Sequence, residues 1–414
     1  MEKNLSGKDV VVEIKKWIES NYFNQISLGE LAEQYFINLN YLCELFLRET
    51  GKNFRTYVTD VRLKKAEQYL IFTDFTIDRI SDLIGYKERG YFTRVFKNSY
   101  GVSPGHFRRK NLEKAAENAE KYVYIAVFRD DPLILDQDIY GLEYFAKQCN
   151  VHAMIEAPAE YDSELSVHIL ENVIKRHPAG IMVCAPDDLF IPYINDAVEK
   201  GIPTITVDCD IPGSKRLATV SSNWKEIGRI MATEAVKAIN YRGKVALLDM
   251  RSMSSPNMKD AFNAFSAIAT QHKEVQLLGE FDDHGNAAWA KQITNELLDE
   301  HPDIAALLGF DSKSAIGICQ VLKERNLKGK VKVFSVDMTT NHIALLREGY
   351  INLLIGQKRS LFTYYGGRIL YDINHSNLEI AKGIAYNKFL NVPDFIDTGL
   401  IVIDRDNLEK YLQR

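Results

Sequence analysis

The sequence lacks the features that mark secreted, membrane-bound and metal-binding proteins. Its 414 residues contain five cysteines, widely scattered and without a CxxC pair, so we expect reduced thiols and no metal site. No run of about 18 apolar residues occurs, and the first residues hold no apolar stretch long enough for a signal peptide. These absences predict a cytoplasmic protein with no membrane partner.

Catalytic signatures are missing as well. The chain has no HExxH motif, no Walker loop and no GxGxxG, and its nine histidines stand without metal-ligand spacing. We therefore expect no enzyme activity and no cofactor.

Charge is distributed unevenly along the chain, whose net charge is −5. Residues 1–112 hold 18 Lys and Arg against 14 Asp and Glu, whereas the remainder holds 33 against 42. A mildly basic front and an acidic back indicate two functions, and a polyanion partner is expected for the front alone.

Residues 26–51 have the pattern of two short helices joined by a turn. Ser27 followed by Glu30 is a capping-box signal, and apolar residues follow at helical spacing. Asn40 is expected to cap the second helix, and Gly51 to end it.

Residues 75–101 repeat this pattern. Thr76 stands 49 residues after Ser27, and Gly101 stands 50 after Gly51. Such a repeat of helix–turn–helix units is a stronger signal than either unit alone. Residues 54–72 between them predict one helix about 28 Å long. The two second helices could then lie about 34 Å apart and enter successive major grooves of DNA.

In the second unit, Tyr91, Phe92 and Phe96 are expected mostly in the core, while Arg94 and Lys97 point outward. Outward cations can reach phosphates, and arginine can bind guanine. A solvated helix face is the simpler explanation of such a charge run, but the duplication argues against it.

The stretch from Gly85-Tyr86 through Tyr91-Phe92 and Gly101-Val102-Ser103-Pro104 to Phe107-Arg108 follows the motif GYxxxxYFxRxFKxxxGxSPxxFR. Residues 8–112 thereby resemble the AraC-type DNA-binding domain. The resemblance implies that both second helices and their flanks contact double-stranded operator DNA. The implied DNA-binding residues are Asn40, Tyr41, Cys43, Glu44, Lys87, Arg89, Gly90, Arg94, Lys97 and Arg108.

Glu44 departs from the family, since many relatives carry a cation at this position. A carboxylate repels phosphate, yet it can accept a hydrogen bond from cytosine N4. Two alternatives therefore stay open: the first unit binds a step that contains cytosine, or it contributes little.

Beyond a polar connector at 113–120, short apolar strands alternate with helical patterns, which predicts a parallel α/β sheet. Residues 121–414 are too many for one sheet, so we expect two lobes, at about 121–221 with 358–390 and 222–357 with 391–414. Acidic residues recur at predicted strand ends, where ligands bind in open α/β sheets. The alternative is that each acid caps the next helix. These residues are Asp131, Asp208, Asp311 and Asp337.

Segments such as KGIPTITVDCD, HPDIAALLGFDSKSAIG and LREGYINLLIGQ resemble, in family order, the periplasmic-binding-protein type I fold in its ribose-binding and lactose-repressor branch. The resemblance implies two lobes joined by crossing strands, with a monosaccharide between them. The implied ligand-binding residues are Asp131, Leu133, Ile134, Asp208, Phe310, Asp337 and Gln357.

The pocket departs from the family at several positions. Relatives often carry aromatic residues at Leu133 and Ile134, asparagine at Phe310, and an arginine in the segment MKDAFNAF. The candidate replacements are Trp289, Phe310, Arg129 and Arg251. Either the ligand is a different sugar, or the domain has lost small-molecule binding and serves dimerisation or a protein partner.

The predicted architecture is thus α + α/β, with an all-α double helix-turn-helix domain followed by a two-lobed α/β domain. The two resemblances imply a DNA-binding transcription regulator that senses a small molecule, expected to be a monosaccharide or a derivative, and controls carbohydrate-utilisation genes. A homodimer is expected, and RNA polymerase is a further partner if the protein activates transcription.

Overall fold

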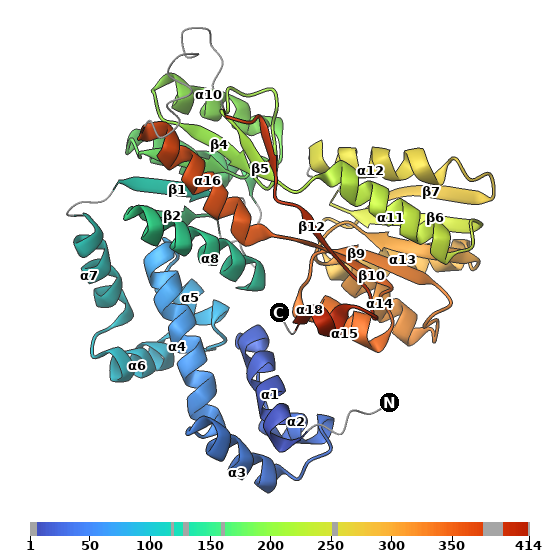
Figure 1. Ribbon diagram of the computed structural model, residues 1–414, viewed down its shortest axis with the longest axis horizontal. Helices are drawn as coiled ribbons and strands as arrows, with labels where there is room; N and C mark the ends of the chain where they lie inside the picture. The colour runs from blue at the N-terminus through green and yellow to red at the C-terminus, as the bar shows by residue number, and fades with distance from the viewer. Residues whose placement is uncertain are drawn as a thin grey trace.

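The computed structural model describes residues 6–116, 120–126, 132–158, 162–250, 256–375 and 392–412. A helical N-terminal part is followed by two α/β lobes (Figure 1). The predicted fold class is confirmed. No helix in the described ranges has the length and apolarity that crossing a membrane requires.

The described N-terminal part repeats one helical unit. Its first helices have seven residues each and its second helices twelve each, and left-handed Gly51 (φ 71°) and Gly101 (φ 76°) end the second helices. The predicted repeat is confirmed. The helices are α1 (Gly7–Asn21), α2 (Leu28–Gln34), α3 (Leu39–Thr50), α4 (Phe54–Phe72), α5 (Ile77–Leu83), α6 (Arg89–Tyr100) and α7 (Pro104–Ala116).

Side-chain caps start α1 to α5, whereas α6 begins without one, and one cap differs from the prediction. Ser27 accepts from the Glu30 amide and Thr76 from the Arg79 amide, as expected. The predicted cap at Asn40 was wrong. Asn38 caps α3, because the helix begins at Leu39, and its Oδ1 accepts from the Asn40 amide at 2.9 Å.

The first lobe is built on a parallel sheet with the strand order β11-β5-β4-β3-β1-β2. Its strands are β1 (Lys121–Ile125), β2 (His152–Glu156), β3 (Gly180–Val183), β4 (Thr204–Val207), β5 (Thr219–Ser221) and β11 (Phe395–Asp397). Its helices are α8 (Pro132–Cys149), α9 (Ser163–Lys175), the 3-10 turn η1 (Asp188–Phe190), α10 (Ile191–Glu199) and α16 (Arg359–Asn374). α8 and α16 cross so closely that a Cβ on Gly141 would meet the Ser360 carbonyl.

The second lobe has the strand order β12-β10-β9-β8-β6-β7, in which β12 pairs antiparallel and the other pairs are parallel. Its strands are β6 (Gly243–Asp249), β7 (Val275–Asp282), β8 (Ile304–Gly309), β9 (Lys332–Val336), β10 (Leu353–Gln357) and β12 (Leu400–Ile403). Its helices are α11 (Trp224–Ala238), α12 (Pro256–Ala269), α13 (Ala287–Glu300), α14 (Ser314–Glu324), α15 (Thr340–Glu348) and α18 (Leu408–Leu412).

The boundary between the lobes differs from the expectation at the C-terminal end. Residues 391–414 were assigned to the second lobe, but β11 pairs with β5 and so completes the first sheet. Only β12 onward belongs to the second lobe. The chain therefore crosses between the lobes after β5, after β10 and after β11. The last crossing could not be predicted from apolar runs, because β11 and β12 are short and of mixed polarity.

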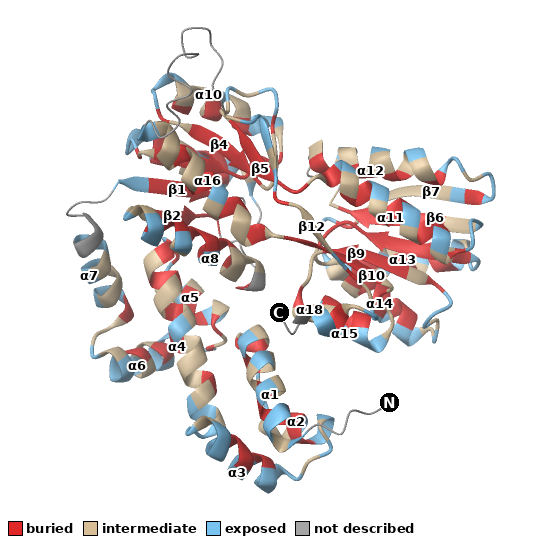
Figure 2. Cartoon of the chain, in the orientation of Figure 1, coloured by how far each residue is buried: buried red, intermediate tan, exposed pale blue. Residues whose placement is uncertain are grey.

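The helical part is divided between two hydrophobic cores (Figure 2). The first unit has its own core, which contains Ile14, Leu42 and Phe46. The second unit and the end of α4 share a continuous core with the first lobe, in which Phe92 and Tyr122 are both fully buried. The second unit is thus packed onto the first lobe, whereas the first unit is packed mainly onto itself.

Polar contacts reinforce this attachment. The hydroxyl of Tyr69 donates to Asp136 of α8 at 2.9 Å, and Lys65 lies 2.8 Å from the same carboxylate. Burial raises the pKa of Asp136 although Lys65 opposes the shift. The second lobe reaches the helical part elsewhere, because Thr340 Oγ1 donates to the Ser20 carbonyl at 2.9 Å. The helical part therefore contacts both lobes.

Candidate nucleic-acid interface and ligand cleft

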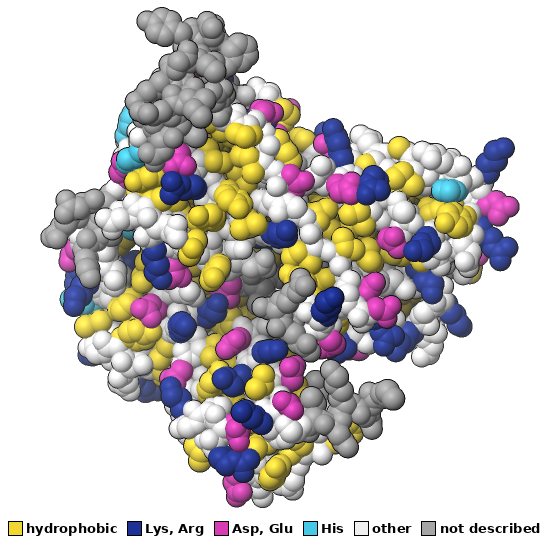
Figure 3. All heavy atoms as spheres, in the orientation of Figure 1, with side chains coloured by type: hydrophobic (Ala, Val, Ile, Leu, Met, Phe, Trp, Pro, Cys, Tyr) yellow, Lys and Arg dark blue, Asp and Glu magenta, His cyan; other side chains and the backbone are white. Residues whose placement is uncertain are grey.

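The outward faces of α3 and α6 form the candidate nucleic-acid interface. Both helices lie at the outer edge of the helical part, away from the sheets (Figure 1). Lys and Arg side chains are interspersed with Asp and Glu over this part (Figure 3). The exposed residues among those predicted to bind DNA are Asn40, Tyr41, Cys43, Glu44, Lys87, Arg89, Gly90, Arg94 and Lys97.

Two arginines of α6 are held in place by neighbours. Arg89 Nη1 lies 3.0 Å from Asp78 Oδ2, and both side chains are more than half exposed, so this pair adds little stability. The Arg94 guanidinium lies 5.3 Å from the centre of the Tyr91 ring. The predicted core position of Tyr91 was wrong: the ring is 37% exposed. Phe92, one residue further round the helix, takes the inward place.

Arg108 differs from the other predicted contacts, because its guanidinium is engaged within the domain. It donates to the Phe75 carbonyl at 2.6 Å and to the Leu70 carbonyl at 3.3 Å. These bonds tie α7 to the segment between α4 and α5. The structure therefore places Arg108 in support of the second unit and apart from the exposed residues of α6.

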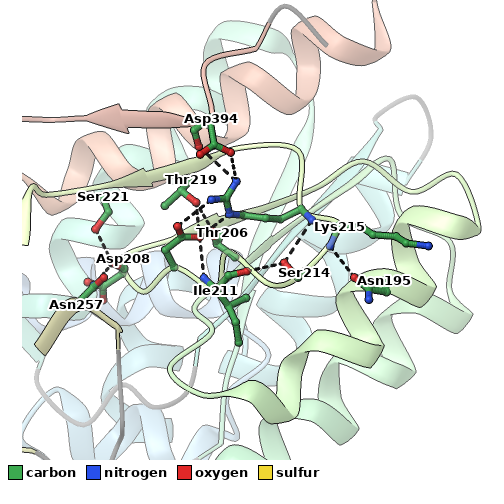
Figure 4. A network of polar contacts seen from close by, with 12 residues as sticks. Asn195, Thr206, Asp208, Ile211, Ser214, Lys215, Thr219, Ser221, Asn257 and Asp394 are labelled. Atoms are coloured by element: carbon green, nitrogen blue, oxygen red, sulfur yellow. Dashed lines mark hydrogen bonds and ion pairs between the residues drawn. The ribbon is translucent and has the colours of Figure 1, made fainter. Parts of the chain in front are cut away.

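The candidate ligand cleft lies between the lobes, where Asp208 follows β4 and Asp337 follows β9. Both residues have left-handed backbones, with φ of 69° and 71°. Such strain in residues other than glycine clusters at functional sites. The Asp208 carbonyl accepts from Asn257 Nδ2 at 2.7 Å, which joins the second lobe to the first (Figure 4).

Arg359 connects the acidic groups of this cleft. Its Nη2 donates to Asp208 Oδ2 at 2.9 Å, and its Nε lies 3.3 Å from Asp138 Oδ1. Burial alone would lower the pKa of Arg359, but the Asp138 and Asp208 carboxylates raise it above its ordinary value. Arg359 follows β10, where the chain crosses between the lobes. We call the three crossings between the lobes the hinge, so this buried cation links the hinge to the cleft.

Asp337 carries the second carboxyl of the cleft. Gln357 Nε2 donates to Asp337 Oδ1 at 3.1 Å. Burial raises the pKa of Asp337 to about 6, although Arg359 and the Gln357 bond oppose the shift. A carboxylate, an amide and a guanidinium that converge in this way can exchange hydrogen bonds with a hydroxylated ligand.

Residues 122–375, more than half of the chain, match the family model of the periplasmic binding protein domain. The chain belongs to this family. Residues 31–110 match the model of a helix-turn-helix domain. The two resemblances predicted from the sequence are confirmed.

Curated relatives match the helical part of the chain. Over 109 residues it is 30% identical to the Msm operon regulatory protein of Streptococcus mutans. The aligned region covers 26% of this chain and 39% of that protein. Over 111 residues it is 38% identical to the uncharacterized transcriptional regulatory protein YesN of Bacillus subtilis. This alignment covers 26% of this chain and 30% of that protein. The chain thus spans well under half the length of these relatives.

Solved structures match the periplasmic-binding-protein domain. The arabinose binding protein AraP of Geobacillus stearothermophilus superposes with a TM-score of 0.61 and 28% identity, over 71% of this chain and 99% of that one. GanP, a glucose-galactose binding protein of the same organism, has a TM-score of 0.64 and 21% identity, over 70% and 99%. The second likeness shows the fold alone.

The other residues predicted for the ligand site of the periplasmic-binding-protein domain are dispersed. Phe310 is buried in the core of the second lobe beside Phe265, and Trp289 is exposed on α13 beside His284. Ile134 is half-buried at the start of α8. Arg129, Asp131, Arg251 and the side chain of Leu133 lie outside the described residues.

Asp311 caps the start of the helix that follows it, which was the alternative to ligand binding for each acid at a strand end. Its Oδ1 accepts from the amides of Lys313 and Ser314, at 2.6 and 2.8 Å. Nearby, burial raises the pKa of Asp249 and of Asp283, and neighbouring carboxyls add to both shifts. Even so, no cluster of acids, histidines or cysteines in the described ranges is arranged to hold a metal ion.

Sequence reasoning missed Arg359, Asp138 and Asn257. Arg359 lies two residues after the predicted Gln357, so the end of β10 was a usable signal. Asp138 is an acid on an otherwise apolar face of α8, with a fully buried side chain. Asn257 is the second residue of α12 and directly precedes the segment MKDAFNAF, in which relatives carry an arginine.

We expect Glu44→Arg to tighten non-specific DNA binding and to steepen its salt dependence. If α3 faces DNA, one added phosphate contact changes the slope of log K against log[salt] by about −0.9. Fluorescence anisotropy with a duplex at several salt concentrations measures this slope. Glu296→Arg, the same charge change on exposed α13, is the control. An equal slope for the two variants would show that α3 faces away from DNA.

We expect Asp337→Asn to stabilise the unliganded protein at neutral pH. The folded-state pKa of about 6 exceeds the ordinary value of 3.8, so stability falls as pH rises through this window and the carboxyl ionises. Removing that ionisation should add about 3 kcal/mol at pH 7.5 and little at pH 4. Thermal unfolding at both values measures this, with Asp406→Asn as an exposed control. A gain that does not shrink at low pH would contradict the assignment.

Proposed function

We propose that the protein is a cytoplasmic, sequence-specific transcription regulator of the AraC type whose periplasmic-binding-protein domain senses a monosaccharide or a derivative to control carbohydrate-utilisation genes. The observation that carries the sensing role is the convergence of Asp208, Asp337, Gln357 and Arg359 between the lobes. Two of the proteins that this chain matches, an operon regulatory protein and an arabinose binding protein, support the two halves of the proposal.

The proposed mechanism is a shift between open and closed lobes. A ligand that bonds both Asp208 and Asp337 favours the closed arrangement, since it can shift the equilibrium only by binding one state more tightly. The second unit is packed onto the first lobe, while Thr340 of the second lobe contacts Ser20 of α1. Closure would therefore move the two units relative to each other and change how they, and those of a dimer partner, fit the operator.

One observation favours a role in assembly. The outer faces of α8 and α16 expose three tyrosines, Tyr140, Tyr144 and Tyr365, whose exposed fractions are 66%, 49% and 40%. Aromatic residues are enriched at protein interfaces. This face supports the proposed homodimer, and it also suits the alternative in which the domain has lost small-molecule binding and serves dimerisation or a protein partner. RNA polymerase is a further proposed partner if the protein activates.

A thermal-shift screen of the full chain against pentoses, hexoses, uronic acids and sugar phosphates tests the sensing role. A true ligand at 100 times its Kd stabilises the folded state by about 2.7 kcal/mol, which is a shift of several degrees. Asp208→Asn should abolish the shift while DNA binding persists. If no compound of the panel shifts the melting temperature of a well-folded protein, the result favours the alternative in which the domain has lost small-molecule binding.

A further inference from the structure

A cavity of about 410 Å³ lies where the helical part meets both lobes. Its walls come from three sources. The helical part contributes Phe23 and Asn24, which follow α1, and Asp82 of α5. The first lobe contributes Pro132, and the second lobe contributes residues that include Asn341. Its volume is within the range of about 300–1,000 Å³ that small-molecule sites occupy.

The cavity borders the same strand-end loops that build the ligand cleft. Of its lining residues, Lys313 stands two positions after Asp311, and Thr339 two positions after Asp337. Pro132 is the first residue of α8 in the first lobe. Ligands of open α/β sheets bind outside the carboxyl ends of the strands. The cavity lies beside these ends, where residues that follow α1 and residues of α5 complete its wall.

The lining chemistry suits a hydroxylated molecule. Asn24, Asp82 and Asn341 are exposed, and within the described residues their side chains make no hydrogen bond. They offer acceptors and amide donors to a ligand. Phe23 supplies an aromatic ring, whose face can pack against the apolar face of a sugar. With one carboxylate and one lysine on opposite walls, the cavity favours a neutral ligand over a strongly charged one.

We propose that this junction cavity is a subsite for the effector, so that the DNA-binding part itself contacts the bound polyhydroxylated molecule. The inference rests on the proposed sensing function. A molecule held by both Asn24 and the second lobe adds to the hydrogen bond between Thr340 and Ser20. Because it binds only when the helical part is docked, it stabilises the docked arrangement in proportion to its occupancy.

Isothermal titration calorimetry of the full chain tests this inference, with arabinose, xylose, ribose, glucose, galactose and tagatose as probes. Each sugar that binds is then titrated into Asn24→Ala and Asp82→Ala. The control is Glu33→Ala: Glu33 is an exposed carboxylate in α2, 49 residues before Asp82, at the equivalent position of the other unit and outside the cavity lining. We expect each cavity variant to weaken binding about fivefold and the control to match the unaltered protein.

Three outcomes overturn the inference, and they can be told apart. If a sugar binds the unaltered protein and Asp208→Asn abolishes binding, but neither cavity variant changes the Kd, the sensing function stands and the subsite is refuted. If no sugar releases or absorbs heat with the unaltered protein, the sensing function fails and the subsite fails with it. Weakening by Glu33→Ala equal to that by Asp82→Ala would also refute the subsite, because the effect would then be general.

Discussion

Arg94→Ala should weaken operator binding by about 10- to 100-fold. Arg94 is exposed on α6 beside Tyr91, and the ring restrains the guanidinium before DNA arrives. An arginine that binds a guanine base contributes about 1–3 kcal/mol of discrimination. Anisotropy with the operator and with a scrambled duplex at the same salt concentration measures both affinities. The loss should be larger for the operator, because a base contact is absent from the scrambled complex.

Arg229→Ala is the matched control for this experiment. Arg229 is an exposed arginine on α11 of the second lobe, so its removal changes the net charge equally without touching α6. If both variants lose the same small amount of DNA affinity, Arg94 acts only through its charge at long range. A loss that is the same for the operator and the scrambled duplex would make Arg94 a phosphate contact and not a base contact.

The elements of the fold were largely predictable because their signals are local. Ser27 and Thr76 stand just before periodic apolar residues, and Gly51 and Gly101 stand just after them. The errors came where a position is decided by packing. Tyr91 differs from its neighbour Phe92 only in the side of the helix that it occupies, which periodicity resolves poorly within one residue.

The site was predictable in part. Asp208 and Asp337 each follow an apolar strand, at the edge of a sheet where ligands bind, and the predicted two-lobed arrangement sets the two strand ends against each other. Arg359 was missed because its partners lie 151 and 221 positions away, at Asp208 and Asp138, and no local pattern encodes such a contact. The place of Phe310 at the end of β8 did not reveal that its side chain packs into the core of the second lobe.

The buried cation at the hinge gives the second large expected effect. Arg359→Met should destabilise the protein by about 3–5 kcal/mol, because it leaves the Asp138 and Asp208 carboxylates without their partner in a buried site. The Asp138 side chain is 1% exposed, so solvent cannot replace the guanidinium there. Urea unfolding followed by far-ultraviolet circular dichroism measures the loss. Arg229→Met, on exposed α11, should lose little.

Arg359→Met combined with Asp138→Asn separates stability from function. Replacing a buried ion pair by neutral residues is often close to neutral, so the double variant should recover much of the loss. If it recovers stability but no longer responds to sugar, the arginine serves to position Asp208 at the cleft. A single variant that unfolds within about 1 kcal/mol of the unaltered protein would contradict the buried contact. A double variant that responds normally to sugar would remove Arg359 from the coupling between cleft and hinge.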